Sequence, residues 1–155
     1  MNGYLPNKLL TWRLVQDHVD KNFLFAATEF GIYFTKDAGT NRVQLSGGIP
    51  TISFRDSTIH RRDDDLVAAS FGRGFFVLDD ISPLRTVTND MLALEAALFD
   101  VPKAHWYTQR EEGLKVGDDK FYAENPPYGA VFTYYLKNKI TTLQDARKEQ
   151  EKSLA

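Results

Sequence analysis

The segment LFAAT at residues 24–28 recurs as LVAAS at residues 66–70, an offset of 42 positions. The segment GIYF at residues 31–34 recurs as GFFV at residues 74–77, an offset of 43 positions. Each segment is short, rich in apolar residues and bounded by turn-forming residues, which is the pattern of a β-strand. A pair of strands joined by a tight link is therefore repeated along the chain, and this repeat decides the fold.

Further strands complete the two repeats. The first repeat gains strands at residues 11–16 and 41–45, and the second gains one at residues 54–61. Pro6 and Pro50 stand before the two units, 44 positions apart. Repeats of about 40–45 residues with four strands each are typical of β-propeller blades. The sequence predicts an all-β fold, an incomplete β-propeller of about two four-stranded antiparallel blades followed by a β-strand and a C-terminal helix. The alternative is a β-sandwich whose strands repeat by chance.

The pattern changes after residue 80. Residues 81–85 are expected to form a turn or a short edge strand, and residues 89–96 a short helix. Residues 130–136 are apolar on both faces and are expected to form a buried strand, whereas residues 141–155 are expected to form a charged helix. The predicted organisation is terminal blades with a crossing segment at 1–109, a linker at 110–124, and the start of a second, truncated β-sandwich-like domain at 125–155.

The composition excludes several classes of function. The 155 residues include 19 Lys and Arg and 21 Asp and Glu, so a net charge of -2 leaves no basic excess to bind nucleic acid. The chain contains no cysteine, which excludes disulfides, thiolate zinc sites and cysteine nucleophiles. No apolar run approaches the roughly 18 residues of a membrane span, and the first residues lack the layout of a signal peptide. We therefore expect no nucleic-acid partner and no membrane span.

Residues 35–42 resemble the Asp-box, or BNR repeat, which reads roughly Ser/Thr-x-Asp-x-Gly-x-Thr-Trp. Thr35, Asp37 and Gly39 match this pattern, whereas Arg42 stands where the family has its final tryptophan. In the structural interpretation, the Asp37 carboxylate accepts backbone N–H bonds across its turn and Gly39 takes a positive φ. The alternative use of these residues is a ligand or metal site. The resemblance favours the structural role.

The same resemblance extends over about residues 3–145. Residues 69–80 and 125–136 are similar to the last blade, and to the segment after it, in bacterial sialidase-like and sortilin-like BNR propellers. Many of those proteins are called glycosyl hydrolases, and an immunoglobulin-like domain follows their propeller. The resemblance implies that the chain is a fragment of an exported protein, periplasmic or extracellular. Its implied partners are the remaining blades and a carbohydrate or protein ligand, with no cofactor and no metal.

The propeller face opposite the Asp-boxes is formed by other links, which supply four candidate cleft residues. These are Glu29, Arg55, Asp56 and Arg73. Carboxylates beside an arginine suit acid–base work on a glycoside or the binding of an anionic sugar. The alternative is an Arg–Asp network that joins neighbouring blades. A sialidase would also need an arginine triad and a Tyr–Glu pair, which these residues do not supply.

Other motifs have simpler interpretations. Residues 63–65 are three aspartates, but they lack the alternating ligands and glycine of an EF-hand loop, so we expect a solvated hairpin turn. His18, His60 and His105 have no partner at helical spacing, so we expect no histidine metal site. Residues 106–107, Trp and Tyr, are the best candidates for an exposed carbohydrate platform.

The sequence thus favours a non-catalytic fragment of a BNR-repeat β-propeller protein with a scaffold or binding role. The competing class is part of a glycoside hydrolase whose catalytic residues lie mostly outside this chain. A partner-binding propeller of sortilin type, with an apolar channel, is a third. Two carboxylates about 5–10 Å apart in one cleft would favour the enzyme. Salt bridges that bury the same groups between blades would favour the scaffold.

Overall fold

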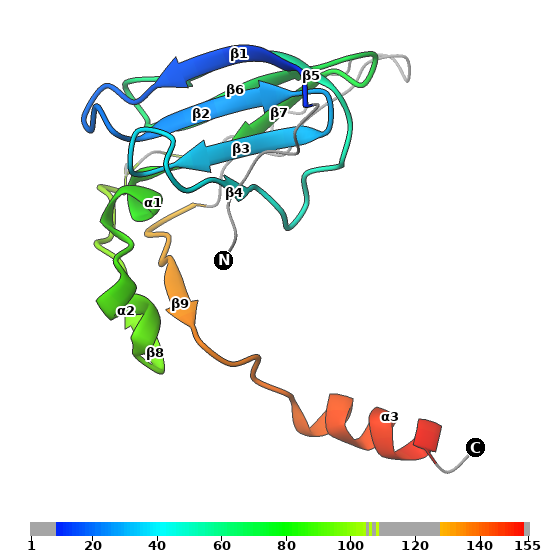
Figure 1. Ribbon diagram of the computed structural model, residues 1–155. Helices are drawn as coiled ribbons and strands as arrows, with labels where there is room; N and C mark the ends of the chain where they lie inside the picture. The colour runs from blue at the N-terminus through cyan, green and yellow to red at the C-terminus, as the bar shows by residue number, and fades with distance from the viewer. Residues whose placement is uncertain (1–8, 105, 107, 109–127, 154–155) are drawn as a thin grey trace. The chain divides into compact units, whose positions relative to one another are not determined.

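The computed structural model describes residues 9–104, 106, 108 and 128–153 (Figure 1). These residues form mostly antiparallel β-sheet with a few short helices, in agreement with the all-β class expected from the sequence. The chain divides into two compact units, Met1–Val87 and Thr88–Ala155. The predicted linker at 110–124 lies outside the described residues, and the domain boundary next to it stays a prediction.

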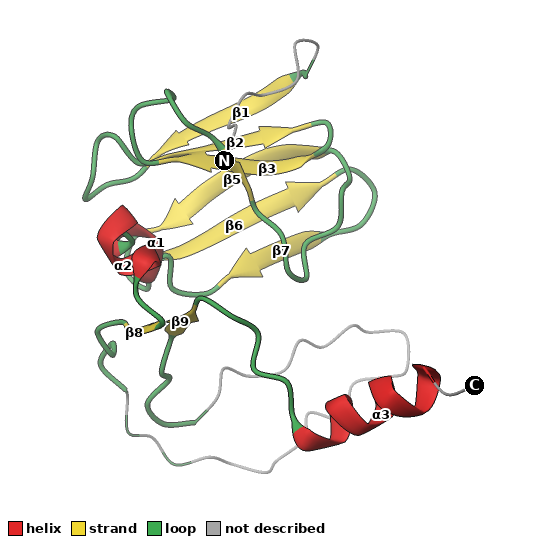
Figure 2. Ribbon diagram, turned by 60° about the horizontal axis from the view of Figure 1, so that its bottom comes forward, coloured by secondary structure: helices red, strands yellow, loops and turns green. Residues whose placement is uncertain are grey.

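The first unit contains two antiparallel sheets. One has four strands in chain order, and the other has three. Figure 2 shows strands of both sheets. The four-stranded sheet consists of β1 (Thr11–Gln16), β2 (Leu24–Thr28), β3 (Gly31–Thr35) and β4 (Val43–Gln44). The three-stranded sheet consists of β5 (Phe54–His60), β6 (Asp65–Ser70) and β7 (Phe75–Leu78). All seven strands fall on segments that the sequence predicts.

The sequence repeat is also a structural repeat. The hydroxyl of Thr28, at the end of β2, donates to the carbonyl of Gly31 at 2.7 Å, and the hydroxyl of Ser70, at the end of β6, donates to that of Gly74 at 2.8 Å. The first strand of each sheet carries a register shift, between Thr11 and Arg13 in β1 and between Phe54 and Asp56 in β5. The two sheets therefore share their turns and their irregularities.

The two repeats bury opposite faces. Phe25 and Ala27 are buried in β2, whereas in β6 the buried residues are Leu66 and Ala68. Because LFAAT aligns with LVAAS, the position of Phe25 corresponds to Val67, which is only half-buried. Successive side chains of a strand point to opposite faces. The first sheet therefore buries the face that carries Phe25 and Ala27. The second sheet buries the opposite face of the repeat, which carries Leu66 and Ala68.

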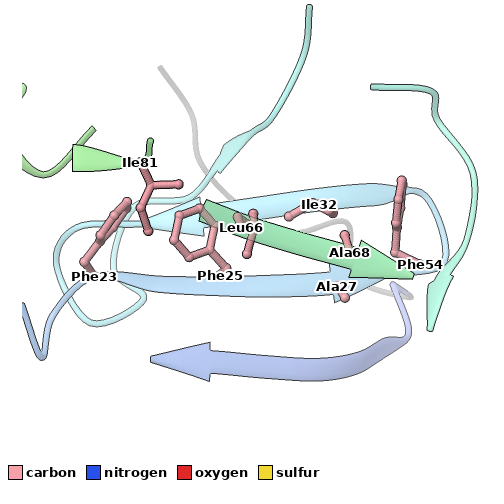
Figure 3. Close-up of a cluster of buried hydrophobic side chains, with 8 residues drawn as sticks. All are labelled: Phe23, Phe25, Ala27, Ile32, Phe54, Leu66, Ala68 and Ile81. Carbon is pink, nitrogen blue, oxygen red and sulfur yellow. The ribbon is translucent and has the colours of Figure 1, made fainter. Parts of the chain in front are cut away.

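The core lies between these two faces (Figure 3). It consists of eight buried side chains: Phe23, Phe25, Ala27, Ile32, Phe54, Leu66, Ala68 and Ile81. The rings of Phe23 and Phe25 are 4.7 Å apart, and those of Phe54 and Phe76 are 5.5 Å apart. Strand β5 lies against both β1 and β2. The small side chains of Ala27 and Ala68 allow the two sheets to pack closely beside the bulky phenylalanines of the core.

A short helix, α1 (Ser82–Thr86), replaces the turn or edge strand expected at residues 81–85. Pro83 lies in its first turn, where the missing N–H is not needed and the fixed φ suits a helix. Asp80 has a φ of 50°, and its carboxylate accepts the N–H of Ser82 at 3.0 Å. This bond satisfies one of the backbone donors that a helix start leaves without a partner.

The second unit contains α2 (Asn89–Ala93), β8 (Ala96–Leu98), β9 (Tyr134–Leu136) and α3 (Leu143–Ser153). The Thr88 side chain accepts the N–H of Met91 and thereby caps the start of α2. Strands β8 and β9 pair antiparallel. The expected buried strand at 130–136 is shorter and more exposed, because β9 pairs only with β8 among the described residues. The hydroxyl of Tyr135 donates to the carbonyl of Leu92 and thereby joins this pair of strands to α2.

Candidate functional site

The turn between β3 and β4 is closed by the carboxylate of Asp37. Its Oδ1 accepts the N–H of Asn41 at 2.8 Å and the hydroxyl of Thr35 at 2.7 Å, and its Oδ2 accepts the Asn41 side-chain amide at 2.6 Å. These hydrogen bonds, that of the Asn41 backbone first, lower the pKa of Asp37 to about 2. Ala38 and Gly39 have φ values of 55° and 101°. Asn41 is a further partner in this turn, and the sequence pattern of Thr35, Asp37 and Gly39 does not indicate it.

The same turn is attached to α1 through Lys36. The Lys36 ammonium donates to the carbonyls of Arg85 and Val87, at the C-terminal end of α1. Cations are favourable at this end because the last carbonyls of a helix have no partner within it. Burial lowers the pKa of Lys36, and the charge of Asp20 opposes this effect.

A buried ionic network lies at this end of the two sheets. Arg85 Nε and Nη2 lie 2.8 Å and 2.7 Å from the two carboxylate oxygens of Asp17, and Nη2 lies 2.6 Å from Asp64 Oδ1. His18 lies between the carboxylates, 3.6 Å from Asp17 and 3.4 Å from Asp64. The network thus joins the β1–β2 turn, the β5–β6 turn and α1. The expectation of a solvated turn at 63–65 is therefore wrong for Asp64.

The two carboxylates of this network titrate abnormally. Burial alone would raise the pKa of Asp17, but hydrogen bonds from Arg85, Asp20 and Val19 outweigh it and lower that pKa. The hydrogen bond from Arg85 is the main cause that lowers the pKa of Asp64. The same two bonds raise the pKa of Arg85. A bidentate guanidinium is the donor best matched to such a buried carboxylate.

The four candidate cleft residues come from the opposite end of the sheets, where β2 and β6 end and β5 begins. The partly buried Glu29 holds the chain before β1, because its Oε1 accepts the N–H of Leu10 at 3.1 Å. Its backbone N–H also donates to the Leu10 carbonyl at 3.1 Å. Arg73 is exposed and makes no hydrogen bond or ion pair within the part of the chain that the structure describes.

Arg55 and Asp56 both contact β1. The Arg55 guanidinium lies 3.7 Å from the centre of the Trp12 ring and 4.9 Å from that of Phe71, a cation–π geometry. The Asp56 carboxylate lies 3.4 Å from Arg13 Nε, and both side chains are exposed. Two of the four candidates therefore link the second sheet to the first. Among the described residues, no hydrogen bond or ion pair joins the four candidates to one another.

A separate groove of about 280 Å³ lies on the uncovered face of the four-stranded sheet. Its lining includes Leu14, Leu24, Ala26 and Tyr33, with Arg42 at the side of the β3–β4 turn. None of the four candidate cleft residues contributes to it. The groove is largely apolar, so it suits an apolar side chain or ligand rather than acid–base chemistry.

One group of possible metal ligands occurs in the described part of the chain. Atoms of His60, Asp63 and Asp65 lie within 4.8 Å of one another at the β5–β6 turn. Arg62 already binds Asp63, with its Nη2 2.8 Å from the carboxylate. The side chains are largely exposed, so the group resembles an ordinary charged turn. No observation on these residues indicates a bound ion, and the expected absence of a metal stays a prediction.

The expected carbohydrate platform at 106–107 is described only in part. Trp106 is exposed, and its ring is 6.4 Å from that of Tyr128. Residue 107 lies outside the described residues, so the platform stays a prediction.

Comparison with known proteins identifies no relative of the chain. No family model, no curated protein and no solved structure matches it. The resemblance to BNR propellers therefore stays a prediction that depends on the residues themselves. In the described residues, no helix has the length and apolar character needed to cross a membrane.

Proposed function

We propose that the chain is a non-catalytic module of a BNR-repeat β-propeller protein, with a scaffold and ligand-binding role. In this proposal the β1–β4 and β5–β7 sheets are two neighbouring blades. The proposal is supported by the repeat, by the face-to-face packing of the sheets and by the contact of their first strands, β1 and β5. A module of this kind holds its neighbours in register and presents its turns to a ligand.

The observation that carries the proposal is that three of the four candidate cleft residues make structural contacts within the first unit. Arg55 is stacked between two aromatic rings, Asp56 faces Arg13, and Glu29 binds the backbone at Leu10. A glycosidase needs two carboxylates that face one glycosidic bond. Here the carboxylates are engaged with a cation or an N–H group of β1 and its approach, which is the role of a scaffold.

The binding part of the proposal rests on the same end of the sheets. Trp12, Phe30 and Phe71 are exposed there, and two of these rings flank the Arg55 guanidinium. Exposed aromatic faces beside a fixed cation suit a carbohydrate or an anionic group on a protein ligand. The alternative, a part of a glycoside hydrolase, places its catalytic groups mostly outside this chain. No contact of the described residues favours it.

The test is a turnover assay on the purified chain and on a Glu29→Gln, Asp56→Asn double variant. We expect neither protein to hydrolyse a panel of aryl glycosides, including a sialoside, above the buffer rate. We also expect the double variant to unfold at a lower urea concentration, because neutral amide oxygens are weaker acceptors for Leu10 N–H and Arg13 than the two carboxylates. Hydrolysis by the natural chain that the double variant lacks would overturn the proposal.

A further inference from the structure

In the described part of the first unit, each of the two sheets has one face that no other sheet covers. We call the uncovered face of the β1–β4 sheet the Leu24 face; it consists of Leu14, Leu24, Ala26 and Tyr33. Leu14 and Tyr33 are the neighbours of Ala26 in the register, so these side chains share one face. The side chain of Leu14 is 61% exposed. Such apolar exposure on a sheet face indicates an interaction surface.

We call the uncovered face of the β5–β7 sheet the Val67 face; it consists of Val67, Ala69, Phe75 and Val77. The register pairs Val67 with Val77 and Ala69 with Phe75. Phe75 is 76% exposed and Val77 is 55% exposed. This face also ends in an edge strand, β7, so both its side chains and its backbone lack a neighbour in the described structure.

The repeat relates these two faces to the interface that the molecule already contains. Leu24 and Ala26 correspond to Leu66 and Ala68, which are buried against the first sheet. Val67 corresponds to Phe25, and Ala69 to Ala27, which are buried against the second sheet. The interface between the two sheets therefore joins the face of the first sheet that is equivalent to the Val67 face with the face of the second sheet that is equivalent to the Leu24 face. The two uncovered faces are the remaining halves of the same interface.

The shapes of the two faces also match. The Leu24 face contains the groove of about 280 Å³, whereas the Val67 face presents the ring of Phe75. An apolar cavity of about 150 Å³ is enough to hold a benzene ring. The groove therefore has room for a phenylalanine side chain. On β5 the Val67 face carries the polar residues Asp56, Thr58 and His60, so its apolar part lies on β6 and β7.

We infer that the Val67 face of one copy of this chain docks on the Leu24 face of a second copy. The inference rests on the proposed function, in which neighbouring blades cover these faces. The contact is heterologous, because each copy contributes a different surface. Successive copies therefore associate head to tail, as the two sheets do within one chain.

The experiment uses sedimentation velocity over a range of concentrations with two single variants. Phe75→Lys places a charge on the Val67 face, and Leu14→Lys places one on the Leu24 face. We expect the natural chain to gain mass with concentration and each variant to stay monomeric. An equimolar mixture of the variants should form a one-to-one dimer, because each keeps the face that the other has lost. Leu143→Lys, which replaces a side chain that is 93% exposed in α3, should behave as the natural chain.

Three outcomes would overturn the inference: a natural chain that is monomeric at every concentration, a single variant that still self-associates, or a mixture that stays monomeric. Circular dichroism checks that each variant is folded, and Val77→Lys replaces Phe75→Lys if it is not. A monomeric natural chain leaves the proposed function standing, because the glycoside assay tests that separately. Turnover in that assay with the docking intact overturns only the proposed function.

Discussion

The guanidinium of Arg85 forms a bidentate pair with the carboxylate of Asp17, at 2.7 Å and 2.8 Å, although the two residues are 68 positions apart. Asp17 lies in the turn between β1 and β2, and Arg85 lies in the last turn of α1. Asp64, in the turn between β5 and β6, binds the same guanidinium. One side chain thus fixes the relative position of three segments that pack around Ile81 and Phe23.

Replacing Arg85 by alanine should lower the free energy of unfolding by about 3 kcal/mol, because it leaves the buried Asp17 carboxylate without its cation. Urea denaturation measures this loss. Arg62→Ala is the matched control, since Arg62 pairs with Asp63 on the surface and exposed pairs contribute only about 0–1 kcal/mol. Similar losses in both variants would contradict a structural role for the Arg85 network.

The stability of the chain should fall on acidification below about pH 4. The pKa values of Asp17, Asp64 and Asp37 are lowered on folding, that of Asp37 to about 2. Their contribution is therefore complete above the unfolded value of 3.8 and is lost as the pH falls through the folded values. Burial raises the pKa of Asp79, with help from Asp65, and this group has the opposite dependence. Among the described carboxyl groups with a shifted pKa, three lose stability on acidification and one gains it.

Urea denaturation of the natural chain and of Asp37→Asn, measured across this pH range, isolates the contribution of Asp37 in the β3–β4 turn. The variant should be less stable near neutral pH, because asparagine offers one weaker acceptor to Thr35 and Asn41. The difference should shrink as the pH falls from about 4 to about 2, where the natural carboxyl takes up its proton. A difference that stays constant over this range would show that the charge of Asp37 has no part in closing the turn.

The strands were predictable because their signal is local. Alternation of apolar residues and tight turns place all seven strands of the first unit, and the pattern of Thr35, Asp37 and Gly39 predicts the turn that the structure shows. The burial of Asp17 was not predictable, because it depends on an arginine that is distant in sequence. The same holds for Asp64, which is one of three adjacent aspartates and differs from them in its φ of 61° and in its contacts with Arg85 and His18.

The contacts of the candidate cleft residues could not be predicted for a different reason. The sequence places Arg55 and Asp56 at the correct end of the sheets, but it does not indicate their partners. Trp12 and Arg13 meet them because β1 and β5 lie against each other and both carry a register shift at this point. Which residues of two repeats touch is decided by packing between sheets, and the periodicity within one repeat carries no information about it.

Leucine-to-alanine substitutions at equivalent positions of the two repeats should differ in cost. Leu66 is fully buried, so Leu66→Ala should destabilise the chain by about 2–5 kcal/mol. Leu24 is its counterpart on an uncovered face and is only half-buried, so Leu24→Ala should cost less than half as much. Urea denaturation at low protein concentration keeps association out of the comparison. Equal costs would show that the two repeats do not bury opposite faces.

The β3–β4 turn offers a test of backbone geometry with its own control. Gly39 has a φ of 101°, and a Cβ there would meet only Arg42 Nη2 at 3.6 Å, so a substitution is limited by the backbone and not by space. Gly39→Ala should therefore destabilise the chain by about 1–3 kcal/mol. Thermal denaturation measures the shift in Tm.

Ala38→Gly, at the neighbouring position, should change stability by less than about 0.5 kcal/mol. Ala38 has a φ of 55°, so glycine relieves the cost of a left-handed alanine. Glycine also gives the unfolded chain more freedom, and the two effects oppose each other. A large loss in Ala38→Gly with no loss in Gly39→Ala would mean that the turn is held by its side-chain bonds alone. The left-handed glycine of the motif would then have no part in the stability of this chain.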